Sequence, residues 1–365
     1  MCGYKALTQI TVDHVSKTYT IGAGQQQRQC AIDDMTFQVK SGESLAILGP
    51  SGSGKTTLLR LIAGLETPDS GAVYYDDQKL TDVGEQDRGI GMVFQDYALI
   101  PHWDARRTIG FFLRLRHRER EVPARVRRVS AITGVGLDKL MGRFPRELSG
   151  GEKQRVAIAR AFARDMRVLL FDEPFANLDA KFRTNARLEL RRLLNEFHVT
   201  TIIVTHDQHE AASLSERILL LDAGRIVQLG PYSHLHDDPE NLFVAEFVGV
   251  PRFNFFEGRV HEGAWQHSHF GSLELPRVAG EGTRLTAAVR PEHVQICSEG
   301  VPGTVEIVTP HFSERYKLVE VTHSGVHWQV QLPLENQVRV GEVLHCKLDV
   351  EKVLFFDTIS GVRFA

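Results

Sequence analysis

The chain has 365 residues, which is too long for one compact domain of ordinary size and fits two or three. Hydrophobic residues make up 42% and charged residues 24%, and the formal net charge is −3, so the composition excludes a disordered chain and a strongly basic nucleic-acid binder. No apolar run approaches the 18 residues of a membrane-spanning helix, and the first residues lack the features of a signal peptide, so we expect a cytoplasmic protein. Cys2, Cys30, Cys297 and Cys346 have no CxxC spacing, which favours reduced thiols over a disulfide or a metal site.

The amino-terminal segment contains the first predicted strands. Gln9–Val15 and Thr36–Val39 alternate apolar and polar side chains, as half-exposed strands do. The polar stretch between them, Ile21–Gln29, is predicted to be a loop without special chemistry.

A glycine-rich loop follows the short apolar strand Ser44–Leu48. Its sequence is GPSGSGKT at Gly49–Thr56, and a helix predicted over Lys55–Ala63 continues from it. This strand–loop–helix context favours a phosphate-binding P-loop, because the backbone N–H groups of the loop and the helix N-terminus then point at phosphate oxygens. Lys55 is predicted to reach the β- and γ-phosphates and Thr56 to ligate Mg²⁺. The residues predicted to bind nucleotide here are Gly49, Pro50, Ser51, Gly52, Ser53, Gly54, Lys55, Thr56 and Thr57.

The middle of the chain alternates strands and helices on either side of a helical, arginine-rich segment that runs from Ala105 to about Arg164. This order predicts a mostly parallel sheet with an all-helical insertion at about residues 96–165. The predicted strands are Gly91–Phe94, Val168–Phe171, Thr200–Thr205, Arg217–Leu221 and Ile226–Leu229, and the predicted helices are Lys181–Phe197 and Gln208–Leu214.

Polar residues follow several of these strands, where ligands bind in open parallel sheets. Asp172 and Glu173 come directly after an apolar strand; we expect Asp172 to hold Mg²⁺ through its coordination water and Glu173 to be the general base. His206 ends the next strand, where its imidazole could donate to the γ-phosphate and interact with Glu173. Gln95 is predicted to contact Mg²⁺ and the attacking water.

The stretch LSGGE at Leu148–Glu152 lies between the P-loop and the acidic strand end. A serine and two glycines that open a helix form a second phosphate cradle. Because the chain already has its own cradle, Ser149, Gly150 and Gly151 are predicted to cap the γ-phosphate held by a partner. Together these motifs resemble the ATP-binding cassette (ABC) ATPases over roughly residues 8–245.

The resemblance implies an α/β P-loop NTPase fold with a RecA-like parallel sheet and an antiparallel β part, and it implies ATP and Mg²⁺ as cofactors. It also implies that Tyr19 stacks on adenine and that Asp179, in Asn177-Leu178-Asp179, belongs to a loop crossing the dimer seam. Two copies would sandwich two ATP molecules and drive import through separate transmembrane permease subunits. The protein would be peripheral, at the cytoplasmic face of the membrane, and served indirectly by an extracytoplasmic solute-binding protein, with no nucleic acid as partner.

The carboxyl-terminal part changes character after a linker helix predicted within 241–251. Short strand-like runs separated by Gly, Pro and His turns predict a β-rich, OB-like barrel domain over 252–365, after an ATPase domain over 8–240. AVRPEHVQI at Ala288–Ile296 resembles an element of the regulatory (TOBE-like) module of importer ATPases. PRFNFFEG at Pro251–Gly258 resembles the entry to that module in carbohydrate importers, so carbohydrate is the first expectation for the cargo. Polyamine, ferric iron and sulfate- or phosphorus-type anions remain alternatives.

Some features leave other possibilities open. Many relatives have glutamine where this chain has Glu152, and Arg106-Arg107 interrupt the usual pattern after Pro101, which bears on the permease partner. The arginine-rich insertion is most simply a solvated face; the alternative is a docking surface for a permease loop or for acidic lipid. A soluble ABC ATPase acting on DNA or ribosomes is less favoured, because the chain has one cassette and only a modest insertion. A degenerate interaction protein is disfavoured by the intact motif residues.

Overall fold

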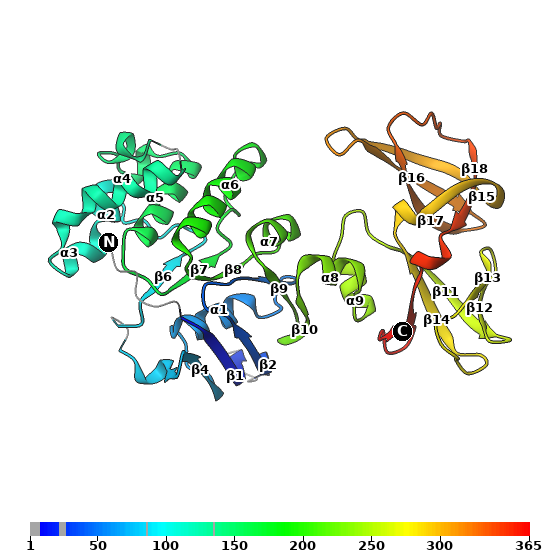
Figure 1. The fold of residues 1–365 in the computed structure, drawn as a ribbon, viewed down its shortest axis with the longest axis horizontal. Helices are drawn as coiled ribbons and strands as arrows, with labels where there is room; N and C mark the ends of the chain where they lie inside the picture. Colours follow the sequence, from blue (N-terminus) through cyan, green and yellow to red (C-terminus); the bar gives the residue numbers. More distant parts are fainter. Residues whose placement is uncertain (1–7, 22–26, 85–86, 134–135) are drawn as a thin grey trace. The chain divides into compact units, whose positions relative to one another are not determined.

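The computed structural model describes residues 8–21, 27–84, 87–133 and 136–365, and it divides into two compact units, Met1–Tyr232 and Ser233–Ala365 (Figure 1). The predicted domain boundaries at 8–240, 241–251 and 252–365 remain a prediction. The division between the two compact units falls at residue 232, eight residues before the predicted end of the ATPase domain. None of the helices among the described residues is both long enough and apolar enough to cross a membrane.

Unit 1 is built on a six-stranded sheet in the order β10-β9-β3-β8-β7-β6. All neighbouring strands are parallel except the pair β9–β10, which is an antiparallel hairpin, as the sequence predicts. The strands are β3 (Ser44–Leu48), β6 (Ile90–Val93), β7 (Val168–Asp172), β8 (Thr200–Val204), β9 (Arg217–Asp222) and β10 (Arg225–Gly230).

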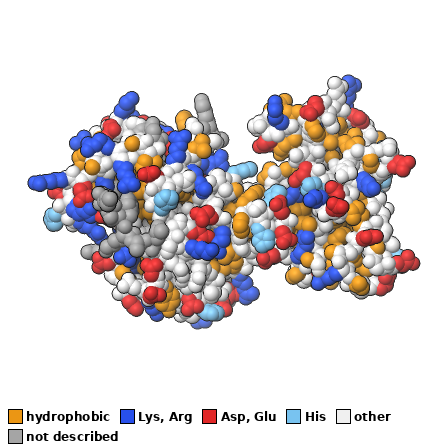
Figure 2. All heavy atoms as spheres, in the orientation of Figure 1, with side chains coloured by type: hydrophobic (Ala, Val, Ile, Leu, Met, Phe, Trp, Pro, Cys, Tyr) orange, Lys and Arg blue, Asp and Glu red, His pale blue; other side chains and the backbone are white. Residues whose placement is uncertain are grey.

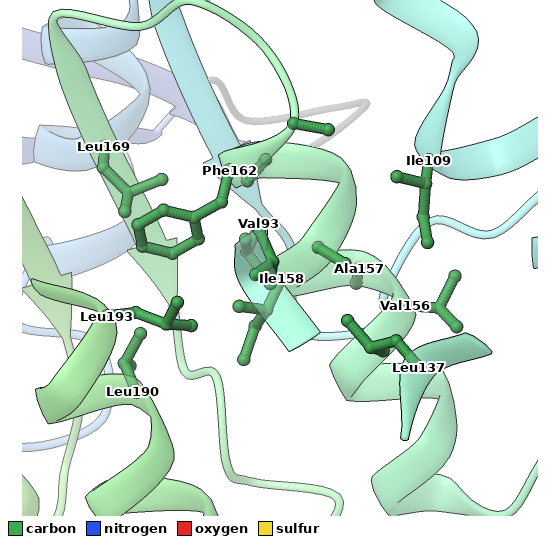
Figure 3. Packing of buried hydrophobic residues seen from close by; sticks show 14 of the residues in the cluster. Val93, Ile109, Leu137, Val156, Ala157, Ile158, Phe162, Leu169, Leu190 and Leu193 are labelled. Atoms are coloured by element: carbon green, nitrogen blue, oxygen red, sulfur yellow. The ribbon is translucent and has the colours of Figure 1, made fainter. Parts of the chain in front are cut away.

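Side chains of the central strands alternate between two hydrophobic cores, as the period of two requires. On β7, Val168 and Leu170 join one core, whereas Leu169 and Phe171 join the other. A strand buried on both faces reads as a continuous apolar run, which is why VLLF was recognisable in the sequence. Figure 3 shows the second core, where Phe162 packs beside Leu169.

The first core lies between the parallel sheet and a four-stranded antiparallel sheet in the order β2-β1-β4-β5, with α1 (Lys55–Ala63) contributing to it. The strands are β1 (Ile10–Ile21), β2 (Gln27–Val39), β4 (Ser70–Tyr75) and β5 (Gln78–Lys79). The loop predicted over Ile21–Gln29 is wrong at both ends, because Ile21 pairs with Gln27 and Tyr19 with Gln29. Ladder hydrogen bonds extend these strands through polar residues that carry no apolar pattern, and residues 22–26 lie outside the described part.

The second core joins the sheet to the helical insertion and to α6. Helix α1 ends at Gly64 in the left-handed region (φ 67°), a position that favours glycine. The remaining helices of this unit are α2 (Ala105–Ile109), α3 (Phe111–Leu115), α4 (Val122–Thr133), α5 (Gly150–Phe162), α6 (Ala180–Phe197) and α7 (Gln208–Leu214), with 3-10 turns η1 (Leu80–Asp82), η2 (Glu119–Glu121), η3 (Leu137–Leu140) and η4 (Pro145–Glu147).

Unit 2 is β-rich, as predicted, and closure into an OB-type barrel remains a prediction. Neighbouring strands in it pair antiparallel. Its two sheets have the orders β13-β12-β11-β14-β19-β20 and β17-β16-β15-β18. They consist of β11 (Asn254–His261), β12 (Ala264–His267), β13 (Gly271–Glu274), β14 (Arg284–Val289), β15 (Val294–His311), β16 (Tyr316–His323), β17 (Val326–Pro333), β18 (Val343–Leu348), β19 (Leu354–Asp357) and β20 (Arg363–Phe364), with 3-10 turns η5 (Pro291–His293) and η6 (Val350–Lys352).

The Arg-Pro-Glu element of unit 2 has a structural function. Arg290 is 3% exposed, and its guanidinium donates to the carbonyl oxygens of His236 (2.7 Å) and Pro251 (3.3 Å). The same group lies 4.0 Å from the ring centre of Phe253. Arg290 therefore ties the sheet to the segment that holds α8 (Tyr232–Asp237) and α9 (Leu242–Phe247).

Candidate nucleotide-binding site

The candidate site lies at the carboxyl edge of the parallel sheet of unit 1. The strands β3, β8 and β7 are neighbours and run in the same direction, so the segments that follow them meet at one edge. Those segments carry the P-loop, His206 and the Asp172–Glu173 pair respectively. The fold thus brings together three motifs that lie far apart in the sequence.

Two P-loop glycines occupy positions that no larger residue could take. A Cβ on Gly49 would lie 2.2 Å from the carbonyl oxygen of Leu221, and one on Gly54 would lie 2.4 Å from that of Ala31. Gly54 (φ 105°) is also the N-cap of α1 and needs the left-handed region. The loop therefore packs closely against β2 and β9, and it leads directly into the N-terminus of α1.

Lys55 is a buried cation whose hydrogen-bond acceptors among the described residues are two carbonyl groups. Its ammonium donates to the carbonyl oxygens of Gly49 (2.9 Å) and Pro50 (2.8 Å), and burial lowers its pKa, although Glu173 and Asp172 oppose that shift. The buried Ser53 hydroxyl has no hydrogen-bond partner among the described residues. A polyphosphate would supply both groups with the acceptors they lack, so these residues fit a nucleotide.

The carboxylates that follow β7 differ in their surroundings. Asp172 accepts a hydrogen bond from the Thr56 hydroxyl at 3.4 Å, and burial, together with the nearby Glu173, raises its pKa. A paired hydroxyl and carboxylate are oxygen ligands of the kind that Mg²⁺ prefers. Glu173 lies in the left-handed region (φ 45°), which is unusual for a residue with a side chain and is typical of functional positions.

His206 lies beside the proposed base. Its Nδ1 atom is 3.3 Å from an oxygen of Glu173, and its side chain is 60% exposed whereas that of Glu173 is 24% exposed. The backbone N–H of Glu173 donates to the carbonyl oxygen of Val204 on β8, which holds the two strand ends together. The structure thus brings Glu173 and His206 into contact.

Gln95 and Tyr19 form hydrogen bonds that the sequence did not reveal. The carbonyl oxygen of Gln95 accepts a hydrogen bond from Asn177 at 2.8 Å, and the exposed Gln95 side chain makes no hydrogen bond to the other described residues. The Tyr19 hydroxyl donates to the carboxylate of Glu66. Asn177 and Glu66 were not predicted as positioning residues, because they are 82 and 47 residues away from their partners and belong to no phosphate motif.

The LSGGE stretch opens α5, as predicted, and makes its contacts with other parts of the chain than the P-loop does. Ser149 is the N-cap, and its hydroxyl accepts a hydrogen bond from the Glu152 backbone N–H. The nearest neighbours of a Cβ on Gly150 would be Asn177 and Leu178, and Gly151 faces Leu178. Asp179 is exposed at the N-cap of α6. None of these contacts is with the chain's own phosphate loop.

Comparison with known proteins identifies the family. A family model described as ABC transporter matches residues 32–176. The sn-glycerol-3-phosphate import ATP-binding protein UgpC of Escherichia coli (strain K12) is 42% identical over 349 residues, covering 91% of this chain and 94% of that protein. The chain belongs to the ABC transporter family of ATP-binding proteins.

Other members support the same assignment. The trehalose/maltose import ATP-binding protein MalK of Thermococcus litoralis is 41% identical over 355 residues, covering 91% of this chain and 94% of that protein. A dimeric structure of the ATP-binding cassette MJ0796 bound to ADP and Pi is 33% identical, with a TM-score of 0.54, and covers 61% of this chain and 98% of that chain. As a family member the chain is an ATPase that uses ATP with Mg²⁺, and the predicted fold class is confirmed.

Proposed function

We propose that this ABC protein is the ATP-hydrolysing subunit of an importer, and that it works as a homodimer beneath separate permease subunits at the cytoplasmic face of the membrane. The observation that carries the proposal is the separation of two phosphate cradles within one chain. The P-loop, Asp172, Glu173 and His206 gather at the sheet edge. The Ser149 hydroxyl instead accepts a hydrogen bond from its own helix, and the nearest neighbours of a Cβ on Gly150 would be Asn177 and Leu178. A second copy would supply the missing cradle, in line with the dimeric relative.

In this proposal each residue has a separate task at the shared site. The P-loop backbone and Lys55 hold the phosphates, Thr56 and Asp172 hold Mg²⁺, and Tyr19 stacks on adenine. Bound Mg²⁺ would neutralise phosphate charge during the reaction. Glu173 accepts the proton of the attacking water, while His206 positions Glu173 and the γ-phosphate. Gln95 orients the water, and Asp179 and the partner's signature residues Ser149, Gly150 and Gly151 close the site.

An apolar groove supports a permease partner. It has a volume of about 590 Å³ and is lined by side chains that include Met92, Phe94, Ile100, Trp103 and Leu115. It adjoins the Gln95 segment, so a helix seated in it would respond when nucleotide moves that segment.

The cargo is proposed as a carbohydrate or a phosphorylated polyol. The relatives whose matches cover more than 90% of this chain include import proteins named for trehalose/maltose and for sn-glycerol 3-phosphate. The ATPase does not touch cargo, so only lineage supports this step. The β-rich unit 2 is proposed as the regulatory (TOBE-like) domain.

The proposal is tested by transport in reconstituted vesicles. The chain and its co-encoded permease subunits are placed in proteoliposomes with their solute-binding protein. We expect ATP-dependent uptake of labelled maltose, trehalose or glycerol 3-phosphate, and no uptake with Lys55→Ala. Failure to associate with any permease, together with full ATPase activity of the free protein, would contradict an importer.

A further inference from the structure

Two sets of arginines in the helical insertion have different surroundings. In the first group, Arg118 and Arg125 both form ion pairs with Glu121 and with Asp165, at 2.5–3.1 Å. Arg125 is 7% exposed, so these pairs join the start of α4 to the end of α5. This part of the basic segment stabilises the fold.

The second group points outward on two short helices. Arg106 and Arg107 on α2 and Arg114 on α3 are exposed, and no carboxylate among the described residues lies within ion-pair distance of their guanidinium groups. The nearby Asp104 carboxylate is the N-cap of α2 and accepts a hydrogen bond from the Arg107 backbone N–H at 2.7 Å. Figure 2 shows Lys and Arg side chains gathered over the end of unit 1 where Figure 1 places these helices.

Apolar side chains accompany these cations. Leu115 on α3 is 63% exposed, and the half-buried Trp103 lies 4.6 Å below the Arg107 guanidinium and 5.1 Å from the ring of Phe111. Exposed arginines beside a tryptophan and a leucine are typical of helices that lie in the headgroup region of a bilayer.

We propose that the exposed side of α2 and α3 binds an anionic phospholipid surface through Arg106, Arg107 and Arg114. This inference rests on the proposed function, which places the ATPase beneath a permease and hence close to lipid headgroups. The three arginines do not line the 590 Å³ groove, whereas Trp103 and Leu115 do, so the proposed lipid-binding cations border the groove proposed for the permease. The net charge of −3 for the whole chain argues that these local cations, rather than overall charge, produce the attraction.

The expected strength follows from the number of cations. Each Arg near an anionic membrane surface adds about 1 kcal/mol, or roughly fivefold in binding, and the attraction weakens as salt shortens the Debye length. Removing three arginines should therefore weaken binding by about a hundredfold.

The test is co-sedimentation of the full chain with vesicles of phosphatidylcholine alone or mixed with phosphatidylglycerol. We expect binding to the mixed vesicles only, reduced by high salt and lost in the Arg106→Gln/Arg107→Gln/Arg114→Gln variant. The matched control is Arg127→Gln/Arg191→Gln/Arg192→Gln, which removes the same charge from α4 and α6 and should bind as the wild type does.

Three outcomes would overturn the inference: equal binding to neutral vesicles, equal losses in the two triple variants, or normal vesicle binding by the first variant combined with failure to assemble with the permease. The last result would assign the arginines to a protein interface. ATPase activity of the free chain should be unchanged in both variants, so a failure of lipid binding is distinguishable from a failure of the proposed function.

Discussion

At the scale of single residues, the site combines buried charges that are unfavourable until a ligand arrives. Burial lowers the pKa of Lys55 and raises that of Asp172, so both charged forms are destabilised relative to water. A folded-state pKa above the ordinary value of 3.8 means that the native state holds its proton more tightly than the unfolded chain does. The contribution of Asp172 to stability therefore falls as pH rises from 3.8 through the folded pKa, and at neutral pH the ionised carboxylate is a cost.

Asp172→Asn is accordingly expected to raise the melting temperature of the nucleotide-free protein at pH 7 by roughly 2–4 °C, while removing the stabilisation by Mg-ATP. The gain should shrink as pH falls toward 3.8, because Asp172 is then protonated. Scanning calorimetry with and without Mg-ATP measures both effects. The exposed Asp77→Asn is the control, and a lower melting temperature for Asp172→Asn than for this control would refute the argument.

Glu173→Gln tests the proposed general base. The amide keeps the shape and can still contact His206, but it cannot accept the proton of water, so turnover should fall by roughly 10²–10⁴-fold. Mg-ATP binding and ATP-driven dimerisation should persist, because the P-loop and signature are intact. Phosphate release and light scattering provide the two readouts, and undiminished turnover would remove Glu173 from this role.

At the scale of elements, the start of α5 explains why glutamate can replace the more usual glutamine of the signature. A Glu152 oxygen accepts the Ser149 backbone N–H at 2.8 Å, while the Ser149 hydroxyl accepts the Glu152 N–H, so the two residues form a capping box. Glutamine offers the same acceptor. The hydrogen bond from the Ser149 N–H lowers the pKa of Glu152, so this stabilisation is present above pH 4.5 and is lost as pH falls through the folded pKa.

We therefore expect Glu152→Gln to be nearly neutral at pH 7 and Glu152→Ala to cost about 1 kcal/mol of unfolding free energy. Urea denaturation at pH 7 compares the two, and at pH below 4.5 the glutamine variant should become the more stable relative to wild type. Equal losses for both substitutions would show that the carboxylate has a function other than capping.

The same helix start should act on the partner. Ser149→Arg places a bulky cation at the proposed seam, so Mg-ATP should no longer promote dimerisation, whereas the monomer should still bind Mg-ATP through its own P-loop. Light scattering and equilibrium binding of a fluorescent nucleotide separate the two properties. Loss of monomer binding would instead place Ser149 in its own chain's site.

The elements that sequence reasoning placed well are those with local signals. The bounds predicted for α1 and α7 agree with the structure, because a local signal marks an end of each helix. Gly64 ends α1, and Asp207 is the N-cap that begins α7. Strand β4, which was not predicted, pairs with β1 across more than 50 residues, and no local pattern encodes that pairing. In the site, the phosphate and acidic motifs were recognisable from the sequence. The hydrogen bond from Tyr19 to Glu66 was not, because it joins residues that only folding brings together.

At the scale of the whole molecule, the separated cradles imply that hydrolysis needs two copies. A dimeric enzyme at concentrations below its dimer dissociation constant has a rate that follows the square of concentration, because the active species is a minority. We expect the ATPase activity per milligram to rise with concentration and then level off, and Glu173→Gln to shift the monomer–dimer equilibrium toward the dimer in Mg-ATP. Activity assays over a hundredfold concentration range, paired with light scattering on the same samples, test this directly.

A constant specific activity in samples that scatter as dimers would indicate tight association and agree with the proposal. The same constant activity in samples that scatter as monomers would show that one chain completes its own site, and the signature of α5 would then need another function.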